Sequence, residues 1–375
     1  MKRVGYIYEK IIDEKNCRAA ILEASKKKSN RKNVRKILSN IDYYAHDLHL
    51  RFILLDFTST YYMKTLNEGL SGKTRIIAVP KFYPDQCAHH AIMRILKPII
   101  KKSSYYWSCA NMTNRGIKRA CIGVERATKH DKRHAKYCGQ TDIRHYYPTI
   151  PHKALKDKLR RKIKDRKALM VLDRVIDSYH SEESDDAGIP IGNYTSPWFA
   201  ELFLQEIDWK IKHDHHIRHY VRYADDGVII DNNKKKMRGV IRDIIQTISS
   251  YGMRIKNSWQ IYRILRDKTK RGRKIDFVGR CFGIGFTTIR KRKALACMRQ
   301  SRKIQKNQNI NKPISPKTAS GFMSRKDCTR YTCSLGFRKK YIYTINIRSL
   351  KEVISNESKR KYLARCGDSR GQCAA

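Results

Sequence analysis

The first 65 residues carry the pattern of basic amphipathic helices. Apolar side chains recur at helical spacing on one face, and lysines occupy the opposite face. The apolar positions are Ile11, Ile12, Ala19, Ile21 and Leu22. This segment is therefore expected to be helical.

Beyond this segment, β-branched runs and helical periods alternate unevenly along the chain. The expected strands lie at 74–79, at the start of 137–150, in a hairpin at 218–230, and at 261–265 and 274–283. The expected helices lie at 85–101 as far as Pro98, at 116–136, at 153–180, from about 194 onward, and at 234–250. This order, with an antiparallel hairpin in its middle, predicts the α+β class.

The central hairpin, RHYVRYADDGVII, places two adjacent acids between two apolar strands. Its flanks predict half-buried strands, with Ala224, Asp225 and Asp226 in the tight turn. Unpaired carboxylates there would repel each other and lose solvation, so a positive partner is expected. Carboxylate oxygens suit Mg²⁺. A second pair, Asp185-Asp186, falls in an acidic, polar loop and is expected to be solvated.

Charge then narrows the class of partner. The chain has 375 residues, with 82 Lys and Arg against 34 Asp and Glu, and a formal net charge of +48. This excess predicts a polyanionic partner, with nucleic acid as the first candidate and an anionic membrane surface as the second. The chain also has 22 tyrosines interleaved with the cations, a mixture that nucleic-acid channels use for stacking and phosphate contacts.

Apolar stretches, the N-terminus and the cysteines indicate whether the protein crosses a membrane and in which compartment it lies. No stretch of about 18 apolar residues occurs, so no membrane span is expected. The N-terminus is too charged for a signal peptide, and the eleven cysteines form no CxxC pair. Reduced thiols and a cytoplasmic location are therefore expected.

A third acid is needed if the pair at the hairpin is to hold two metal ions for phosphoryl transfer. Asp142 is the best candidate, because it lies at a predicted strand end and is followed by Ile143 and two aromatic residues. A turn or helix-cap role for Asp142 is the alternative.

Several segments, in this order, resemble the reverse transcriptase family. They are GKTRIIAVP, DQCAHHAIMRILKPI, DIRHYYP, GIPIGNYTSPWFAELFLQEID, YADD, YGMRIKNSWQIYRI and KIDFVGRCFG. The likeness covers roughly residues 45 to 345. Ile191, where many members have Gln, resembles the diversity-generating retroelement branch and the related bacterial defence enzymes, whereas Pro197 departs from the Ser-Gln common in the former.

The resemblance implies a right-hand polymerase that is bacterial or phage-encoded. Its expected parts are a basic helical extension at 1–45, fingers at 46–140, a palm at 141–285, and a helical basic thumb with a tail at 286–375. The implied activity is RNA-directed DNA polymerisation, with error-prone copying in a diversity-generating retroelement. The alternatives are a phage-defence enzyme that works with a noncoding RNA, and a catalytically lost RNA-binding scaffold.

The resemblance also implies roles for individual residues. Asp142 and Asp225 would hold two Mg²⁺ ions, or Mn²⁺ in their place, with help from the Ile143 carbonyl. Asp226 would be an outer acid. The two ions would lower the pKa of the primer 3′-OH and neutralise charge on the triphosphate.

The nucleotide would meet a second group of residues. Lys73 and Arg75 share one face of a predicted strand and would grip the triphosphate, although a solvated cation pair is the alternative. Tyr147 would lie beneath the sugar and exclude a 2′-OH. Gly192 would allow template or nucleotide to approach closely, and Ile191 would weaken base selection.

The resemblance also implies contacts with primer and template and a set of partners. Tyr223, Gly279 and Arg280 are expected at the primer or template. The partners would be an RNA template, a DNA or RNA primer, dNTPs, and either a small basic accessory protein or a structured noncoding RNA. The basic thumb would follow the duplex by shape and phosphate contacts, with affinity that falls steeply with salt.

Overall fold

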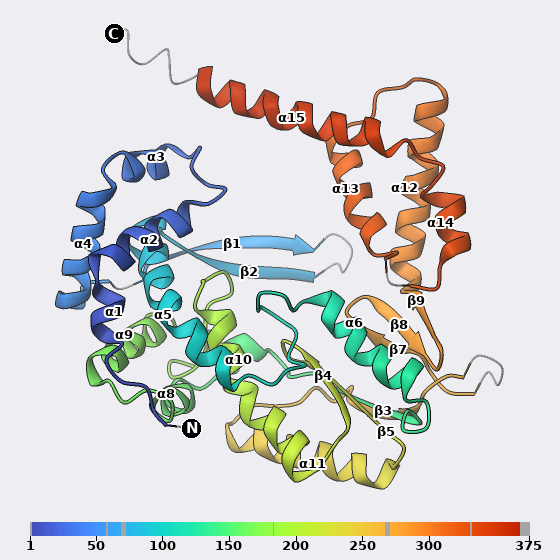
Figure 1. Ribbon diagram of the computed structural model, residues 1–375, viewed down its shortest axis with the longest axis horizontal. Coiled ribbons are helices and arrows are strands. Elements are labelled where there is room, and N and C mark those ends of the chain that lie inside the picture. Colours follow the sequence, from blue (N-terminus) through green and yellow to red (C-terminus); the bar gives the residue numbers. More distant parts are fainter. Residues whose placement is uncertain are drawn as a thin grey trace. The chain divides into compact units, whose positions relative to one another are not determined.

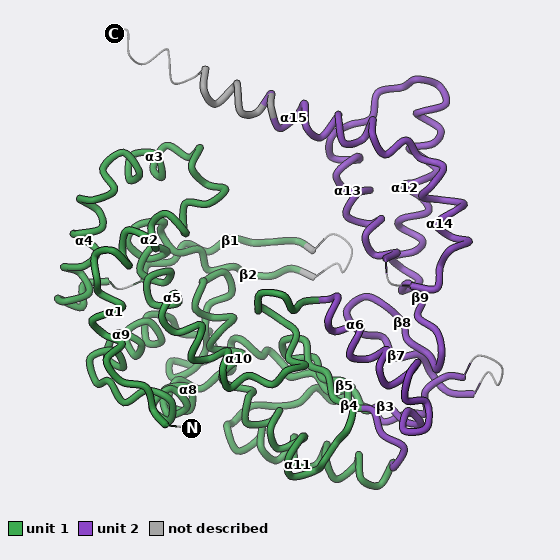
Figure 2. The backbone as a smooth tube through the Cα atoms, in the orientation of Figure 1, with its two compact units in different colours: residues 1–116, 139–229, 234–260 green, residues 117–138, 230–233, 261–375 purple. Residues whose placement is uncertain are grey.

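The computed structural model describes residues 2–57, 59–68, 73–182, 184–266, 271–330 and 332–367, without the side chains of 68, 73, 359 and 361–367. The chain divides into two compact units (Figure 2). The first contains residues 1–116, 139–229 and 234–260, and the second contains 117–138, 230–233 and 261–375. The domain boundaries expected near residues 45, 140 and 285 stay predictions. None of the described helices has the length and apolar composition that a membrane crossing needs.

The first unit begins with helices, as predicted, but they end at Leu54 and residues 61–65 belong to a strand, where helix was predicted (Figure 1). The helices are α1 (Tyr8–Ile12), α2 (Glu14–Ser25), α3 (Lys32–Ser39) and α4 (Ile41–Leu54). The Asp13 side chain accepts a hydrogen bond from the Lys15 N–H and so caps the start of α2. Ile11 and Ile21 are fully buried, but Leu22 is 43% exposed, because the buried face of α2 runs through Cys17 and the alanines instead.

An antiparallel hairpin of β1 (Tyr61–Glu68) and β2 (Lys73–Pro80) follows, with Tyr61 opposite Pro80 and Glu68 opposite Lys73. The strand predicted at 74–79 is confirmed. A short π-helix, η1 (Phe82–Gln86), leads into α5 (Cys87–Ser103). The helix was predicted to be interrupted at Pro98, but α5 continues through it. A proline removes one intrahelical hydrogen bond, and the packing of α5 against α2 keeps the helix intact.

A four-stranded sheet has the order β4-β5-β3-β6. Its strands are β3 (Tyr137–Thr141), β4 (His219–Tyr223), β5 (Asp226–Asp231) and β6 (Gln260–Arg263). The helix α11 (Lys234–Ser250), which the sequence predicted at these residues, covers one face of this sheet. An added Cβ on Gly139 of β3 would lie 3.1 Å from Met237 and 3.2 Å from Ile241.

The remaining helices of the first unit are α7 (Tyr146–Thr149), α8 (His152–Arg160), α9 (Arg166–Asp177), α10 (Ser196–Trp209) and the π-helix η3 (Lys210–Asp214). A single helix was predicted over 153–180, and the structure divides it. Asp165 starts α9 as a separate helix by accepting a hydrogen bond from the Ala168 N–H. The predicted core positions of α10 are confirmed as buried: Trp198, Phe199, Leu202 and Phe203.

The second unit combines a small sheet with helices. An antiparallel sheet has the order β7-β8-β9, with β7 (Ile275–Phe277), β8 (Arg280–Gly283) and β9 (Phe286–Ile289). The helices are α6 (Ile117–Glu125), the π-helix η2 (Arg126–His130), α12 (Lys291–Asn309), α13 (Pro316–Asp327), α14 (Leu335–Tyr341) and α15 (Ile347–Gly367). The basic C-terminal region is therefore helical, as predicted.

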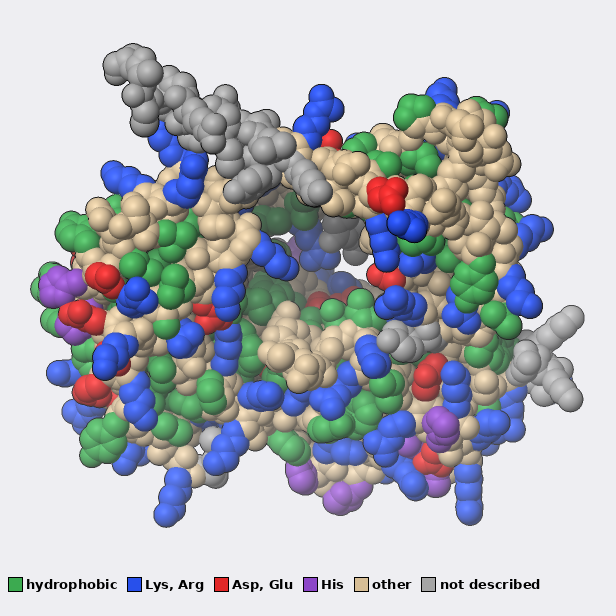
Figure 3. Space-filling model, turned by 45° about the horizontal axis from the view of Figure 1, so that its top comes forward, with side chains coloured by type: hydrophobic (Ala, Val, Ile, Leu, Met, Phe, Trp, Pro, Cys, Tyr) green, Lys and Arg blue, Asp and Glu red, His purple; other side chains and the backbone are tan. Residues whose placement is uncertain are grey.

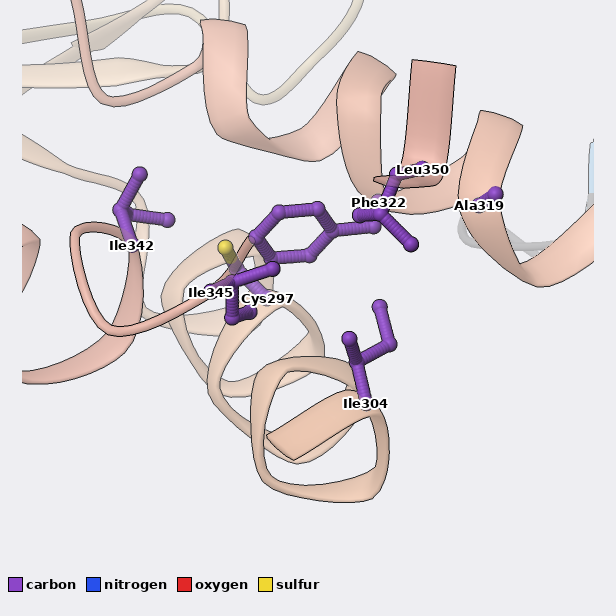
Figure 4. Packing of buried hydrophobic residues seen from close by; sticks show 7 residues of the cluster. All are labelled: Cys297, Ile304, Ala319, Phe322, Ile342, Ile345 and Leu350. Atoms are coloured by element: carbon purple, nitrogen blue, oxygen red, sulfur yellow. The ribbon is translucent and has the colours of Figure 1, made fainter. Parts of the chain in front are cut away.

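A separate apolar cluster holds these C-terminal helices together (Figure 4). Phe322 of α13 lies at its centre, with Cys297 and Ile304 of α12, Ile345 and Leu350 around it. Ser315 caps the start of α13 by accepting a hydrogen bond from the Thr318 N–H. Both units thus combine helices with antiparallel sheets, and the predicted α+β class is confirmed.

Candidate active site

The hairpin that carries the acid pair is present as predicted, but its turn is shorter, because Asp226 was predicted in the turn and lies in a strand. Its strands are β4 and β5, and Ala224 and Asp225 form the turn between them, while Asp226 begins β5. Ala224 has a φ of 56°, a left-handed conformation that is unfavourable for a residue with a Cβ. A turn of this kind needs support from its surroundings.

Arg222, which the sequence analysis did not select, supplies that support. Its Nη1 donates a 2.9 Å hydrogen bond to the Ala224 carbonyl. Its Nε and Nη2 donate to the Asp208 carboxylate at 2.7 and 2.6 Å, and Nη2 also lies 3.1 Å from Glu201 Oε1. The side chains of Arg222, Glu201 and Asp208 are only 3%, 2% and 0% exposed. The signal in the sequence was a single arginine between Val221 and Tyr223 in an apolar strand.

Backbone contacts fix the same residue from a second direction. The Arg222 N–H donates to the Trp107 carbonyl at 3.0 Å, and the Cys109 N–H donates to the Arg222 carbonyl at 2.8 Å. The segment around Ser108 therefore runs parallel beside β4. The strand that leads into the acid turn is held by both its backbone and its buried side chain.

Asp142 directly follows β3, and its position is set by the segment around Lys256. The Lys256 N–H donates to the Asp142 carbonyl at 2.8 Å, and Lys256 Nζ forms an ion pair with Asp142 Oδ2. The other carboxylate oxygen, Asp142 Oδ1, is buried and has no hydrogen-bond partner. Lys256 was not selected from the sequence, where it was one cation among many in YGMRIKNSWQ.

Sheet order brings Asp142 to the hairpin turn, because β3 and β5 are neighbours. Gly227, the second residue of β5, lies against Thr141, the last residue of β3: an added Cβ on Gly227 would be 2.9 Å from Thr141 Oγ1. Burial and then the adjacent Asp142 carboxylate raise the pKa of Asp225 to about 6, although Lys256 acts in the opposite direction. The structure thus brings Asp142 and Asp225 together, as the sequence predicted.

The Ile143 carbonyl is turned away from the neighbouring chain segment. Ile143 pairs with Ile255 across an antiparallel bridge, flanked by the hydrogen bonds from Lys256 to Asp142 and from Arg144 to Arg254. At such a position, the N–H and C=O groups of the residue point away from the partner segment. The carbonyl is thus not engaged by the segment around Ile255.

The groups present fit a hard divalent cation. Two adjacent carboxylates whose repulsion Lys256 offsets only in part, a buried oxygen without a partner and a backbone carbonyl are all oxygen donors of the kind that Mg²⁺ prefers. Among the described residues, no group of three or more His, Cys, Asp and Glu side chains is arranged to hold a metal. Mg²⁺ commonly binds through one or two carboxylates and completes its coordination with water and substrate phosphates.

One of the predicted nucleotide contacts, Tyr147, is electrostatically coupled to the Asp225 carboxylate. Burial raises the pKa of the Tyr147 phenol to about 12, the Asp225 carboxylate adds to this rise, and the Arg75 guanidinium opposes it. The side chain of Asn111 also acts on the Tyr147 phenol and lowers its pKa. Arg75 is exposed on β2. Lys73 begins β2, but its side chain lies outside the described residues.

Ile191 and Gly192 lie against the hairpin strand β2. The Ala78 N–H donates to the Ile191 carbonyl at 2.9 Å. Gly192 has a φ of 115°, and an added Cβ would be 2.7 Å from the Ala78 carbonyl oxygen and 2.6 Å from Ile77 Cγ2. Glycine at this position therefore allows β2 itself to approach closely.

A Gly192→Ala variant is expected to lose about 1–3 kcal/mol of unfolding free energy, since the new methyl meets a backbone oxygen in a conformation that already disfavours a side chain. Urea denaturation measures this. The matched control is Gly239→Ala in α11, where an added Cβ meets nothing within 4 Å; it should gain about 0.5–1 kcal/mol. Equal stability of Gly192→Ala and the wild type would contradict the close contact between Gly192 and β2.

The other predicted residues are placed as follows. Tyr223 ends β4 and is half-buried, and Asp226 is also half-buried. Gly279 and Arg280 belong to the second unit, where the Arg280 guanidinium is buried and donates to the Arg330 carbonyl at 3.2 and 3.3 Å. The second acid pair, Asp185-Asp186, is exposed, as predicted.

Comparison with known proteins gives the class. The profile of the family "Reverse transcriptase (RNA-dependent DNA polymerase)" matches residues 64–271, which is more than half of the chain. The chain therefore belongs to the reverse transcriptase family, and the predicted membership is confirmed at that level.

Individual relatives are distant. Protein YkfC of Escherichia coli (strain K12) is 23% identical over 237 residues, which are 53% of this chain and 60% of YkfC. Among solved structures, apo telomerase from Candida tropicalis truncated from its C-terminal domain has a TM-score of 0.45 at 15% identity, over 63% of this chain and 55% of that one. Telomerase from Candida albicans, in complex with the TWJ fragment of telomeric RNA, has a TM-score of 0.44 at 12% identity, over 82% and 56%.

Proposed function

We propose that the chain is an RNA-directed DNA polymerase that extends a DNA or RNA primer on an RNA template. The observation that carries this proposal is the meeting of Asp142 and Asp225, with one Asp142 carboxylate oxygen buried and without a hydrogen-bond partner. The high positive charge supports a nucleic-acid partner, and Lys and Arg side chains are spread over the face drawn in Figure 3.

Asp142, Asp225 and the Ile143 carbonyl would hold two Mg²⁺ ions, which Mn²⁺ can replace. When bound, these ions supply a lowered pKa for the primer 3′-OH and charge neutralisation on the triphosphate. Asp226 would act from outside this set. In the metal-free protein, Lys256 provides part of the positive charge that the carboxylates need. Lys73 and Arg75 would bind the triphosphate, and Tyr223, Gly279 and Arg280 the primer or template.

The direct test is incorporation of dNTPs on a primed RNA by the purified full chain. Incorporation is expected with Mg²⁺ or Mn²⁺ and is expected to stop in EDTA. Binding of primed RNA without incorporation under either metal would overturn the polymerase proposal and favour the scaffold alternative.

Tyr147 is proposed to exclude ribonucleotides, because its phenol is within electrostatic reach of the Asp225 carboxylate. A Tyr147→Ala variant should lose roughly tenfold to a few hundredfold of its preference for dNTPs over rNTPs, the range that one steric contact supplies. The ratio of kcat/KM values for dTTP and rUTP measures this. Tyr147→Phe, which keeps the ring, should retain the preference, and equal preferences in the Ala variant and the wild type would refute the role.

The branch is proposed from Ile191, which offers no hydrogen-bonding side chain beside β2. We propose error-prone copying, as in diversity-generating retroelements. An Ile191→Gln variant should make about three- to tenfold fewer errors at template adenines, because one added hydrogen bond is worth about 1 kcal/mol. Sequencing of cDNA measures the errors, with Ile191→Leu as the control. An unchanged error spectrum in Ile191→Gln would remove this support.

The identity of the RNA separates the branch from its alternative. Sequencing of cDNA made in cells should show a repeat copied with errors at adenines, made together with a small basic accessory protein. A faithful copy of a structured noncoding RNA would favour the phage-defence alternative instead.

A further inference from the structure

A cavity of about 650 Å³ lies in the first unit, apart from the carboxylate pair. Its walls come from α2, α5, the loop that follows α5, and the start of α10. A volume of this size lies within the range of small-molecule and nucleotide sites, roughly 300–1,000 Å³. None of the roles proposed above uses it.

Cations dominate one wall. Arg94, Lys97 and Lys101 line the cavity, and their spacing of three and four residues places them on one face of α5. Pro98 lies on the same wall, and it removes the N–H that would otherwise bond to the Arg94 carbonyl.

The only acid among the lining residues, Glu23, is already engaged. Its carboxylate lies 3.1 Å from Arg94 Nη1 and 3.6 Å from Lys97 Nζ. It also accepts a 3.0 Å hydrogen bond from the Tyr194 hydroxyl. Burial favours its neutral form, yet the Tyr194 hydroxyl and the neighbouring cations hold the pKa of Glu23 below its ordinary value. One acid against three cations leaves the wall with a net positive charge.

Lys101 is the cation that remains for a ligand. It is exposed, and no acidic partner for it exists in the part of the chain that the structure describes. Its neighbour Lys102 is also exposed but does not line the cavity. Burial lowers the pKa of Lys97, so a second negative charge in the cavity would favour the charged form of that side chain.

Neutral donors face the same space, and one connects it to the candidate active site. Asn111 and Thr113 line the cavity with an amide and a hydroxyl, groups that bind phosphate oxygens in nucleic-acid complexes. The Asn111 side chain also lowers the pKa of Tyr147, which the Asp225 carboxylate raises. The cavity thus shares a wall residue with the ring beside the acids.

We propose that this cavity binds a phosphate group of a nucleotide at a site separate from the carboxylate pair. The phosphate belongs either to a single-stranded RNA or to a free nucleotide, and the two sources share the same chemistry. This binding site is defined by the cavity residues and does not depend on the proposed polymerase function.

The test compares Lys101→Gln with Lys102→Gln, which remove the same charge from adjacent exposed positions. The full-length protein is titrated in EDTA, so that metal-dependent nucleotide binding and incorporation do not contribute. The probes are a fluorescent uridine hexamer, followed by anisotropy, and dTTP as a second ligand and competitor. Unchanged thermal unfolding of both variants shows that the fold is intact.

Lys101→Gln should bind the hexamer, dTTP or both about tenfold more weakly than Lys102→Gln does. This is the effect expected for loss of one charged hydrogen bond. For the hexamer, the slope of log affinity against log salt should also decrease by about 0.7. If dTTP neither competes nor distinguishes the variants, the phosphate comes from the RNA strand; if it does both, the source is a free nucleotide.

Equal affinities of the two variants for both probes would overturn the inference. The outcome is independent of the polymerase test, because binding in EDTA needs no incorporation. A chain that binds through Lys101 but never extends a primer would keep this site and lose the proposed function.

Discussion

An Asp225→Asn variant should lose dNTP incorporation and yet be more stable than the wild type. Its free energy of unfolding should be higher. In the proposed role, Asp225 holds a metal ion, and its loss would remove several kcal/mol of transition-state stabilisation. Because about 1.4 kcal/mol corresponds to a factor of ten, the rate should fall about a thousandfold or more. The stability gain has a separate cause. Asp225 is buried beside Asp142, and its pKa is raised to about 6.

The sign of the stability effect follows from that pKa. A carboxyl group whose pKa is higher in the folded than in the unfolded protein binds its proton more tightly when folded. Its favourable contribution is present below about pH 4 and is lost as the pH rises through about 6. At pH 7 the ionised Asp225 therefore destabilises the fold, and the asparagine should recover about 1–3 kcal/mol, since one pKa unit corresponds to about 1.4 kcal/mol.

Two measurements check this pair of effects. Primer extension on RNA with Mg²⁺ gives the rate, and urea unfolding in EDTA at pH 7 and pH 4 gives the stability, with the gain expected only at the higher pH. Asp185→Asn is the matched control, because it alters the exposed acid pair and should change neither quantity. A variant that is both active and no more stable at pH 7 would contradict the assignment of Asp225.

An Arg222→Met variant should lose about 3–5 kcal/mol of unfolding free energy. The change leaves Asp208 and Glu201, both almost fully buried, without their positive partner, and an uncompensated buried charge costs about this amount. Chemical denaturation measures the loss. Arg35→Met on the exposed face of α3 is the control and should change stability by less than about 0.5 kcal/mol.

A triple variant separates the charge balance from the support of the turn. Adding Asp208→Asn and Glu201→Gln to Arg222→Met removes the uncompensated charges and should restore much of the lost stability. The hydrogen bond to the Ala224 carbonyl stays absent, so primer extension should remain slow. Full activity in the triple variant would show that Arg222 has only a structural role.

The sequence predicted those parts of the site that depend on local patterns. The hairpin of β4 and β5 and its acid turn follow from apolar runs around two aspartates, and Asp142 follows from its position at a strand end. The membership in the reverse transcriptase family came from the order of several such segments. Each of these signals lies within a few consecutive residues.

What the sequence did not reveal depends on residues far apart in the chain. Lys256 lies 114 residues from the aspartate with which it pairs, and no pattern distinguished it from the other 81 cations. The continuation of α5 through Pro98 depends on tertiary packing, which overrides the local preference. The close contact between Gly192 and β2 was also not predicted, because only the folded chain shows it.

The buried Arg222 network constrains how this sequence can change over time. Any single substitution of Arg222, Asp208 or Glu201 leaves a buried charge without its partner. Each intermediate on a mutational path would therefore be less stable. Buried ion networks can be replaced without loss by well-packed apolar residues when all members change together. Drift at these three positions should therefore be concerted, and a descendant that has lost the arginine should also have lost the acids.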